Sequence, residues 1–423
     1  MRILLISRCP PYPLHLGDRL IVYHLARELN ARGHQIDLLA LTDDLDDIRS
    51  RHEYADLFAS VQLFPDAPRS PFSVLRRALL SSARFPRRAA AAWSPDLWTA
   101  IETHVAQQHY DVAHVFGGIS VYEMAGALGT LPALITPYES YSLYLKRQRA
   151  TAPPRPLSIW RAGVDARVSR MEKGLAGAVK YWLARRCEAF MFAPPPPLTP
   201  YRRIIVLSSA DADELRALNP AYPLAIIPNG VDLDYFAPIA VERAPHRLLF
   251  VGNYDYAPNA DAALWLAREI MPRVRERIPD ATLQLVGNAP TAEMSALASE
   301  RVEIVGRVPD MRPYYAGAAA FACGLRFGAG IKNKVLEALA MGCPVVATPL
   351  SADGIAAEHE HDILIAAADP DTFAAALVRA LSDAELRQGL SANGRALIES
   401  RYSWGRVVQQ YERLYQQTIE ESS

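Results

Sequence analysis

The sequence predicts an α/β fold of two Rossmann-like domains, each a doubly wound parallel sheet covered by helices. Three observations lead to this prediction. Short continuous apolar runs, such as residues 3–6, are typical of strands buried on both faces. Amphipathic helical segments alternate with these runs, and the alternation occurs in two successive series. At 423 residues, the chain is also too long for one ordinary core.

The first series begins with a strand at residues 3–6, followed by a proline-containing loop at 9–18. An amphipathic helix is expected over residues 19–32, because apolar side chains recur on one face and Gly33 then stops it. A second strand at 36–41 completes a βαβ unit, which implies parallel pairing. Further strands are expected at residues 111–115, 133–136, 204–207 and 225–227.

The second series begins at His246, and glycines follow its first three strands. The expected strands are residues 247–251, 282–286, 302–305, 318–323 and 344–348, with helices near 260–277 and 332–341. Two series imply two domains, and the hinge between them is expected at residues 237–246.

Composition and charge narrow the functional classes. A net charge of −1 does not favour electrostatic binding of nucleic acid. The four cysteines show no CxxC spacing, which argues against a zinc site or a disulfide framework and favours a reducing cytosol. No stretch approaches the roughly 18 apolar residues of a membrane span. A cytoplasmic protein is therefore expected, with peripheral contact to the inner face of a membrane left open.

Two basic segments interrupt the regular pattern, at residues 69–98 and 146–192, where arginines and lysines stand among leucines and aromatic residues. One interpretation is a pair of basic helices that touch anionic lipid or a phosphate-bearing acceptor. The other is ordinary solvated helix faces joined by loops. The sequence does not decide between them.

The segment most informative about chemistry is residues 328–342. Gly328 and Gly330 let the backbone approach a ligand closely, and the helix that follows offers unpaired N–H groups to an anion such as a diphosphate. Lys332 and Lys334 add two ammonium groups at the same end, and Glu337 lies one turn further along, where it can accept hydrogen bonds from a ribose diol. A sugar nucleotide needs both the anion site and the diol site.

Each of these features also has a simpler explanation. Many α/β proteins have a glycine loop before a helix, and the lysines can face solvent. Glu337 is harder to explain in that way, because Leu336 and Ala338 flank it on a short helix between buried strands. A buried acid without a ligand needs another partner.

These residues carry a family resemblance. Residues 327–348 resemble the signature of retaining, GT-B-fold glycosyltransferases of family 4, in the subgroup with Gly-x-Gly-x-Lys-x-Lys-x-x-Glu. The resemblance covers nearly the whole chain, through residues 10–18, 26–34, 227–232, 250–252, 305–309 and 402–415.

The resemblance implies a GT-B fold with its two domains facing a cleft. Residues 1–240 are expected to bind the acceptor and residues 241–400 the nucleotide-sugar donor. A helix within 401–423 is expected to cross back to the first domain. The implied reaction moves a hexosyl-type sugar, with retention, from a UDP- or GDP-linked donor to a sugar, lipid-linked or small-molecule acceptor. No metal and no further cofactor are implied, and the setting is polysaccharide or glycolipid assembly.

The resemblance also suggests individual roles. The residue that matches Glu337 holds the donor ribose, and a loop that matches Gly17 and Asp18 lies under the phosphates and the transferred sugar. The remaining residues expected to bind donor are Gly252, Asn253, Arg307, Val308, Gly328, Gly330, Ile331, Val335 and Leu336.

Three departures from the family pattern qualify this assignment. Ala329 stands where the family often has a glutamate that contacts the donor sugar, and Asn253 is the first of three residues where an arginine and a lysine are common. Lys332 or Lys334 is therefore expected to neutralise the diphosphate. Tyr138, followed by Glu139, replaces a frequent histidine.

Tyr138, Glu139 and His114 are the candidate acceptor residues, although His114 also fits a structural histidine at the end of an apolar strand. Two rival functions share the architecture. One is a sugar-nucleotide epimerase, and the other is a non-catalytic homologue that binds nucleotide sugars.

Overall fold

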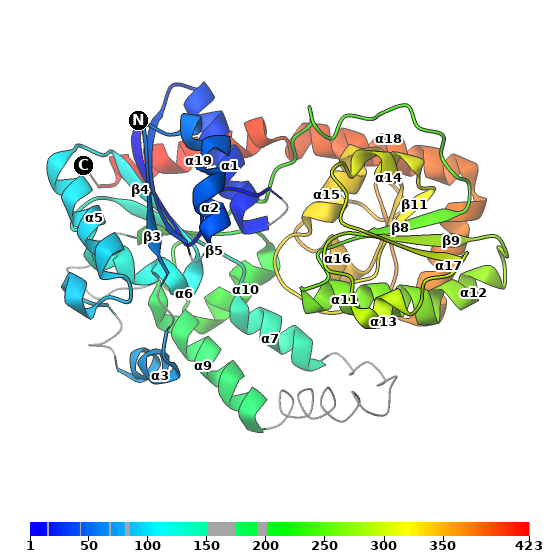
Figure 1. Ribbon diagram of the computed structural model, residues 1–423, viewed down its shortest axis with the longest axis horizontal. Helices are drawn as coiled ribbons and strands as arrows, with labels where there is room; N and C mark the ends of the chain where they lie inside the picture. The colour runs from blue at the N-terminus through cyan, green and yellow to red at the C-terminus, as the bar shows by residue number, and fades with distance from the viewer. Residues whose placement is uncertain are drawn as a thin grey trace. The chain divides into compact units, whose positions relative to one another are not determined.

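The computed structural model describes residues 1–14, 17–42, 44–66, 69–80, 85–150, 175–192 and 201–422, which form two units (Figure 1). The first unit comprises the described residues within Met1–Lys146, Leu157–Ile227 and Trp404–Ser423. The second comprises those within Arg147–Pro156 and Pro228–Ser403. Residues 237–246, the expected hinge, belong to the second unit.

Seven parallel strands form the sheet of the first unit, in the order β3-β2-β1-β4-β5-β6-β7. In chain order they are β1 (Arg2–Ser7), β2 (Gln35–Thr42), β3 (Ser60–Pro65), β4 (Val112–Phe116), β5 (Ala133–Tyr138), β6 (Tyr201–Val206) and β7 (Leu224–Ile226). The predicted βαβ unit is present, with Ile3 of β1 opposite Ile36 of β2. The edge strand β3 was not predicted from the sequence.

Helix α1 (Gly17–Ala31) connects β1 and β2 and buries one face against the sheet. Its end confirms the expected role of Gly33, which adopts a φ of 81°. The backbone N–H of His34 then donates to Leu29 O at 3.1 Å, which satisfies a carbonyl in the last turn of the helix.

Among the described residues, the other α-helices of the first unit are α2 (Leu45–Arg49), α3 (Pro71–Leu79), α5 (Pro95–Gln107), α6 (Gly118–Val121), α7 (Tyr141–Ala150), α9 (Leu175–Met191), α10 (Ser209–Leu218) and α19 (Trp404–Glu420). Of these, α7 continues into the second unit. Their apolar faces cover a core of fully buried side chains that includes Trp98, Phe116 and Ile135.

Helix α19 belongs to the first unit although it is the last helix of the chain. It packs against α1 and β4 and buries Tyr411 and Tyr415. His34 Nε2 lies 2.8 Å from Glu412 Oε1, and Arg32 donates to Gly405 O at 3.0 Å. The core of the first unit therefore includes residues from both ends of the chain.

The second unit contains a six-stranded parallel sheet in the order β10-β9-β8-β11-β12-β13. Its strands are β8 (Arg247–Val251), β9 (Thr282–Val286), β10 (Val302–Gly306), β11 (Ala320–Cys323), β12 (Val345–Ala347) and β13 (Leu364–Ile365). Its helices are α11 (Ala257–Trp265), α12 (Met271–Arg275), α13 (Ala292–Ser295), α14 (Arg312–Gly317), α15 (Asn333–Ala340), α16 (Pro349–Ala352), α17 (Pro370–Ser382) and α18 (Ala384–Arg401).

The helix expected near residues 260–277 is not continuous. A π-helical turn, Leu266–Ile270, separates α11 from α12. Pro272 explains the break, because proline has no N–H with which to continue the pattern of i to i−4 hydrogen bonds.

None of the helices in the described ranges combines the length and the apolar character needed to cross a lipid bilayer. Of the two basic segments, residues 81–84, 151–174 and the four prolines at 194–197 that follow the second lie outside the described residues, as does His15.

Candidate active site

The loop between β11 and α15 contains the glycines that the sequence analysis selected. Gly328 has a φ of 133° and Gly330 a φ of 66°, conformations that other residues rarely adopt. A Cβ at Gly328 would meet its nearest atom, Tyr256 Oη, at an ordinary 3.7 Å. Backbone conformation, rather than lack of space, therefore requires glycine at this position.

Lys332 stabilises this loop from inside. Its side chain is buried, and its ammonium group donates to Ala329 O at 2.8 Å and to Gly330 O. The charge therefore lies at the loop's own carbonyl oxygens. In this geometry, Lys332 fixes the shape of the glycine loop in front of α15.

Lys334 occupies a different environment on the first turn of α15. Its Nζ donates to Asn259 Oδ1 at 2.5 Å and lies 4.8 Å from the centre of the Phe250 ring. Burial lowers the Lys334 pKa to about 8, although nearby Glu337 acts in the opposite direction. An anionic ligand beside Lys334 would favour the protonated form.

Glu337 lies one turn along α15 and is half-buried. Tyr315, which is fully buried on α14, donates its hydroxyl to Glu337 Oε2 at 3.0 Å. Burial raises the Glu337 pKa, while the Tyr315 hydrogen bond and Lys334 lower it. Glu337 Oε1 has no hydrogen-bond partner among the described residues. Tyr315 is thus the protein partner that a buried acid requires, and it leaves one oxygen available to accept a ligand hydroxyl.

The ends of β8 and β9 lie close together beside these residues. A Cβ at Gly287, whose φ is 144°, would lie 1.8 Å from Gly252 O, and a Cβ at Gly252 would lie 2.8 Å from Asn259 Cγ. A larger residue at Gly287 would require movement of the backbone, and one at Gly252 would require movement of the Asn259 side chain. Asn259 in turn donates to Asn253 O at 2.8 Å, so it connects the residue after Gly252 to Lys334.

The other residues expected to bind donor are less closely grouped. Arg307 is exposed and Val308 half-buried after β10, where Gly306 turns the chain with a φ of 77°. The Ile331 side chain is buried in the glycine loop. Val335 and Leu336 are fully buried, and their N–H groups donate to Lys332 O. These last two residues support the helix and offer no side-chain donor of their own.

A further basic side chain of this unit, Arg326, was not identified from the sequence. Arg326 binds both oxygens of Asp261, with distances of 2.9 and 2.5 Å, and lies 5.5 Å from the centre of the Trp265 ring. The sequence feature that could have indicated Arg326 is its position between a buried strand, β11, and the glycine loop. Asn259 and Tyr315 gave no comparable signal, because the fold brings them from distant parts of the sequence.

In the first unit, Asp18 and Tyr138 both lie beside Arg8. Arg8 ion-pairs with Asp18, with its Nε 3.0 Å from Oδ2, and its guanidinium lies 5.6 Å from the centre of the Tyr138 ring. Burial acts to raise the Asp18 pKa, but the charge and hydrogen bond of Arg8, with smaller contributions from Cys9 and Arg19, together hold that pKa below its usual value. Two of the predicted residues are thus brought together by a third that the sequence analysis did not select.

Gly117 makes room for this arrangement. It follows β4 with a φ of 116°, and a Cβ there would lie 2.7 Å from three carbon atoms of the Arg8 side chain. Gly17 and Asp18 form the start of α1, so the carboxylate lies at a helix N-terminus, where the helix dipole favours negative charge.

The segment after Tyr138 is held by two buried carboxylates. Tyr138 adopts a φ of 71°, which is strained for a tyrosine. Asp211 of α10 accepts from the N–H of Ser140 at 2.8 Å. Glu188 of α9 accepts from the N–H groups of Tyr141 and Ser142, at 2.6 and 3.1 Å.

Burial raises the Glu188 pKa to about 7, against the effect of these hydrogen bonds. Three successive N–H groups thus bind two carboxylates directly after Tyr138 and Glu139. Glu139 itself is half-buried.

His114 lies in the core of the first unit. It is fully buried, with Nδ1 at 2.6 Å from Tyr415 Oη and Nε2 at 2.8 Å from Thr136 Oγ1. Burial lowers its pKa well below 6.5. Because both ring nitrogens already have partners, the geometry gives His114 the structural role that the sequence analysis kept as an alternative.

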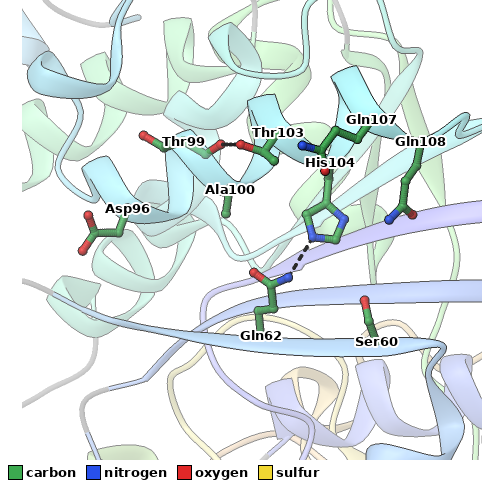
Figure 2. A pocket seen from close by; sticks show the side chains of 9 residues that line it. All are labelled: Ser60, Gln62, Asp96, Thr99, Ala100, Thr103, His104, Gln107 and Gln108. Carbon is green, nitrogen blue, oxygen red and sulfur yellow. Dashed lines mark hydrogen bonds between the residues drawn. The ribbon is translucent and has the colours of Figure 1, made fainter.

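A cavity of ≈ 550 Å³ lies elsewhere in the first unit, between β3 and α5 (Figure 2). Polar side chains line it, and His104 contacts Gln62 at 3.0 Å. None of the predicted site residues lines this cavity. Within each unit, the candidate residues instead lie at the carboxyl ends of strands, where ligands bind in open parallel sheets. These strands are β1 and β5 in the first unit and β8, β10 and β11 in the second.

Two family models match the chain. The model described as Glycosyltransferase Family 4 matches residues 20–235, and the model described as Glycosyl transferases group 1 matches residues 245–383.

Among curated proteins, a phosphatidyl-myo-inositol mannosyltransferase of Mycolicibacterium smegmatis is 32% identical over 200 residues, which is 45% of this chain and 51% of the relative. An MMP alpha-(1->4)-mannosyltransferase of Mycolicibacterium hassiacum is 28% identical over 275 residues, covering 61% of this chain and 65% of the relative. The chain spans about half the length of the first curated relatives it matches.

Solved structures show the same fold at low identity. Sucrose-phosphate synthase from Thermosynechococcus elongatus aligns with a TM-score of 0.70 and 19% identity, over 99% of each chain. HepE from Anabaena, solved in complex with UDP, aligns with a TM-score of 0.64 and 15% identity, over 99% of this chain and 100% of that one.

Proposed function

Because this chain belongs to glycosyltransferase family 4, we propose that it transfers a hexosyl group from a nucleoside-diphosphate sugar to an acceptor hydroxyl, with retention of anomeric configuration. The expected GT-B fold agrees with the two parallel sheets and with the solved neighbours. The observation that carries the proposal is Glu337, whose Oε2 is fixed by Tyr315 while Oε1 is left to accept a hydrogen bond.

In the proposed complex, Glu337 accepts hydrogen bonds from the donor ribose, and Lys334 lies beside the diphosphate. The spacing of these residues favours this assignment, because Lys334 and Glu337 are three residues apart and lie on the same side of α15. Lys332 keeps the glycine loop in the conformation that lets the backbone approach the phosphates.

Charge develops on the leaving nucleoside diphosphate as the glycosidic bond breaks. Lys334 and the N–H groups at the start of α15 are the groups proposed to stabilise this charge, and one good donor contributes about 3–4 kcal/mol in such sites. Asn259 orients the Lys334 ammonium group and is therefore a positioning residue.

For the acceptor, we propose a lipid-linked or lipid substrate in polysaccharide or glycolipid assembly, bound by the first unit. The names of the M. smegmatis relative and of the matching mycobacterial proteins support this proposal, because each is called a phosphatidyl-myo-inositol mannosyltransferase, which names a lipid. Tyr138 and Glu139 are the proposed acceptor residues. The buried carboxylates that hold the following turn give this segment a defined conformation.

Thermal unfolding in the presence of UDP, GDP, ADP and their common sugars tests the donor site. Ligand at a hundred times its dissociation constant stabilises a protein by about 2.7 kcal/mol. We expect one nucleotide class to stabilise the wild type and to lose this effect in Glu337→Ala. Stabilisation by none of these ligands would refute the proposed site.

Product analysis tests the reaction. Transfer to a lipid acceptor with an inverted anomeric centre would refute retention. Turnover of the nucleotide sugar without an acceptor would favour an epimerase, and binding without turnover would favour a non-catalytic homologue.

A further inference from the structure

Helices α3 and α9 expose an unusual share of the chain's large apolar side chains. Fourteen such side chains are exposed in the described part of the chain, and seven of them lie on these two helices or directly after α3. They are Phe72, Leu75, Leu79, Leu80, Val179, Trp182 and Phe190. A concentration of this kind marks an interaction site more often than chance exposure.

The exposed apolar residues of each helix share one side. Phe72, Leu75 and Leu79 of α3 are spaced by three and four residues. The orientation of α3 is fixed from within, because buried Arg77 ion-pairs with Glu123 and lies 3.7 Å from the centre of the Trp93 ring.

On α9, Val179, Trp182 and Phe190 lie on one side. The opposite side carries Glu188, which is buried under α7. Each helix therefore buries one charged side chain, Arg77 on α3 and Glu188 on α9, and exposes its apolar side.

The two helices lie side by side at the lower edge of the first unit (Figure 1). Tyr141, which is 45% exposed, continues this surface, because Lys180 Nζ lies 6.0 Å from the centre of its ring. Hereafter these exposed side chains of α3 and α9 are called the α3–α9 face.

Among the described residues of α3 and α9, the exposed charges have one sign. The sequence of α3 contains no acid, and Glu188, the one acid of α9, is buried. The exposed ionisable residues are Arg76, Lys180 and Arg185, and Arg186 lies half-buried with its guanidinium 5.8 Å from the centre of the Trp182 ring. Apolar side chains that stand beside cations, with no exposed acid on these two helices, complement a surface that is anionic outside and apolar beneath.

We propose that the α3–α9 face docks the protein on a membrane that contains anionic lipid. The aromatic and leucine side chains enter the interface, and the lysine and arginines contact lipid phosphates. A symmetric contact with a second copy is disfavoured, because it would place the same cations against one another. This inference goes beyond the proposed function and needs no sugar transfer for its test.

The test is co-sedimentation of the full chain with vesicles, one set of phosphatidylcholine alone and one set mixed with phosphatidylglycerol. We expect binding to the mixed vesicles, weaker binding to phosphatidylcholine, and loss of binding at high salt because screening weakens the charge contacts. The double variant Phe72→Ser, Trp182→Ser should lower the partition coefficient by about tenfold or more. The double variant Lys180→Glu, Arg185→Glu should lower it by roughly tenfold or more on the mixed vesicles.

The matched control is Leu45→Ser, Ile48→Ser, which removes two side chains on α2 that are 69% and 52% exposed. This control should bind vesicles as the wild type does. No binding of the wild type to mixed vesicles, or equal binding by all variants, would overturn the proposal.

Light scattering in solution tests the alternative occupant. A wild-type dimer that becomes a monomer in Phe72→Ser, Trp182→Ser would assign the face to a second copy and overturn the proposal. Vesicle binding by a protein that transfers no sugar would refute the proposed function and would still support membrane docking through the α3–α9 face.

Discussion

The hydroxyl of Tyr315 offers a direct test of the donor site. Tyr315→Phe removes the group that donates to Glu337 Oε2 at 3.0 Å and changes nothing else in size or shape. A hydrogen bond to a charged group contributes about 1.5–3 kcal/mol. Because this bond only orients the carboxylate, we expect the lower end of that range, about a tenfold loss of nucleoside-diphosphate affinity measured by calorimetry.

The pH dependence of the Tyr315→Phe variant follows from the same contact. Burial raises the Glu337 pKa and the Tyr315 hydrogen bond lowers it, so the variant's carboxyl protonates at a higher pH than that of the wild type. Protonation removes an acceptor for the ribose. The affinity difference between wild type and variant should therefore widen as pH falls.

A matched control exists in the same unit. Tyr254 is also buried, and its hydroxyl donates to Val286 O at 3.2 Å, away from Glu337. Tyr254→Phe should bind nucleotide as the wild type does. If Tyr315→Phe also binds as the wild type while Glu337→Ala does not, Glu337 acts without orientation by Tyr315 and the reasoning fails.

Three further predictions concern other parts of the two units. Nucleoside-diphosphate affinity should fall as pH rises through about 8, where Lys334 loses its proton, and Lys334→Met should abolish that step in a calorimetric pH series. The acceptor KM should rise as pH falls through about 7, where Glu188 becomes protonated and binds the N–H groups of Tyr141 and Ser142 less strongly. Glu188→Gln should show a high acceptor KM at every pH. Because the pKa of Glu188 is raised in the folded state, its ionisation lowers the folding stability as pH rises toward 7, and the full loss is present above pH 7. A Glu188→Gln variant that changes Tm but leaves the acceptor KM unchanged would therefore contradict this role. Gly117→Ala should lower the unfolding free energy by about 2–4 kcal/mol in urea titrations, through its positive φ and its overlap with Arg8. Gly33→Ala, with a positive φ but no atom within 4 Å, should cost about 1 kcal/mol, and equal losses for the two would refute the overlap argument.

The sheets were predictable where strands are continuous apolar runs. Buried strands such as β1 and β8 show such runs, and glycines mark the ends of β8 and β9. The edge strand β3 was missed, because its sequence mixes Ser60, Gln62 and Pro65 with apolar residues. The two-residue strand β13 is too short to give any pattern.

In the candidate site, contacts between residues close in sequence could be predicted, and contacts between separate elements could not. Lys334 and Glu337 share a helix, so their proximity follows from helical periodicity. Tyr315, Asn259 and Arg8 come from separate elements, and only the fold brings them to their partners. The direction of the Lys332 side chain was equally unpredictable, because a flexible lysine reaches either a ligand or its own loop.

The position of α19 has a consequence for how the chain is made. A ribosome synthesises the whole of the second unit before it reaches Trp404, so the first unit lacks α19 until the second unit has been made. During that interval, His114 lacks the Tyr415 hydroxyl, and α1 and β4 lack their covering helix. Nascent chains halted near Ser403 should therefore remain protease-sensitive in residues 1–227, even though every earlier segment of the first unit has been translated.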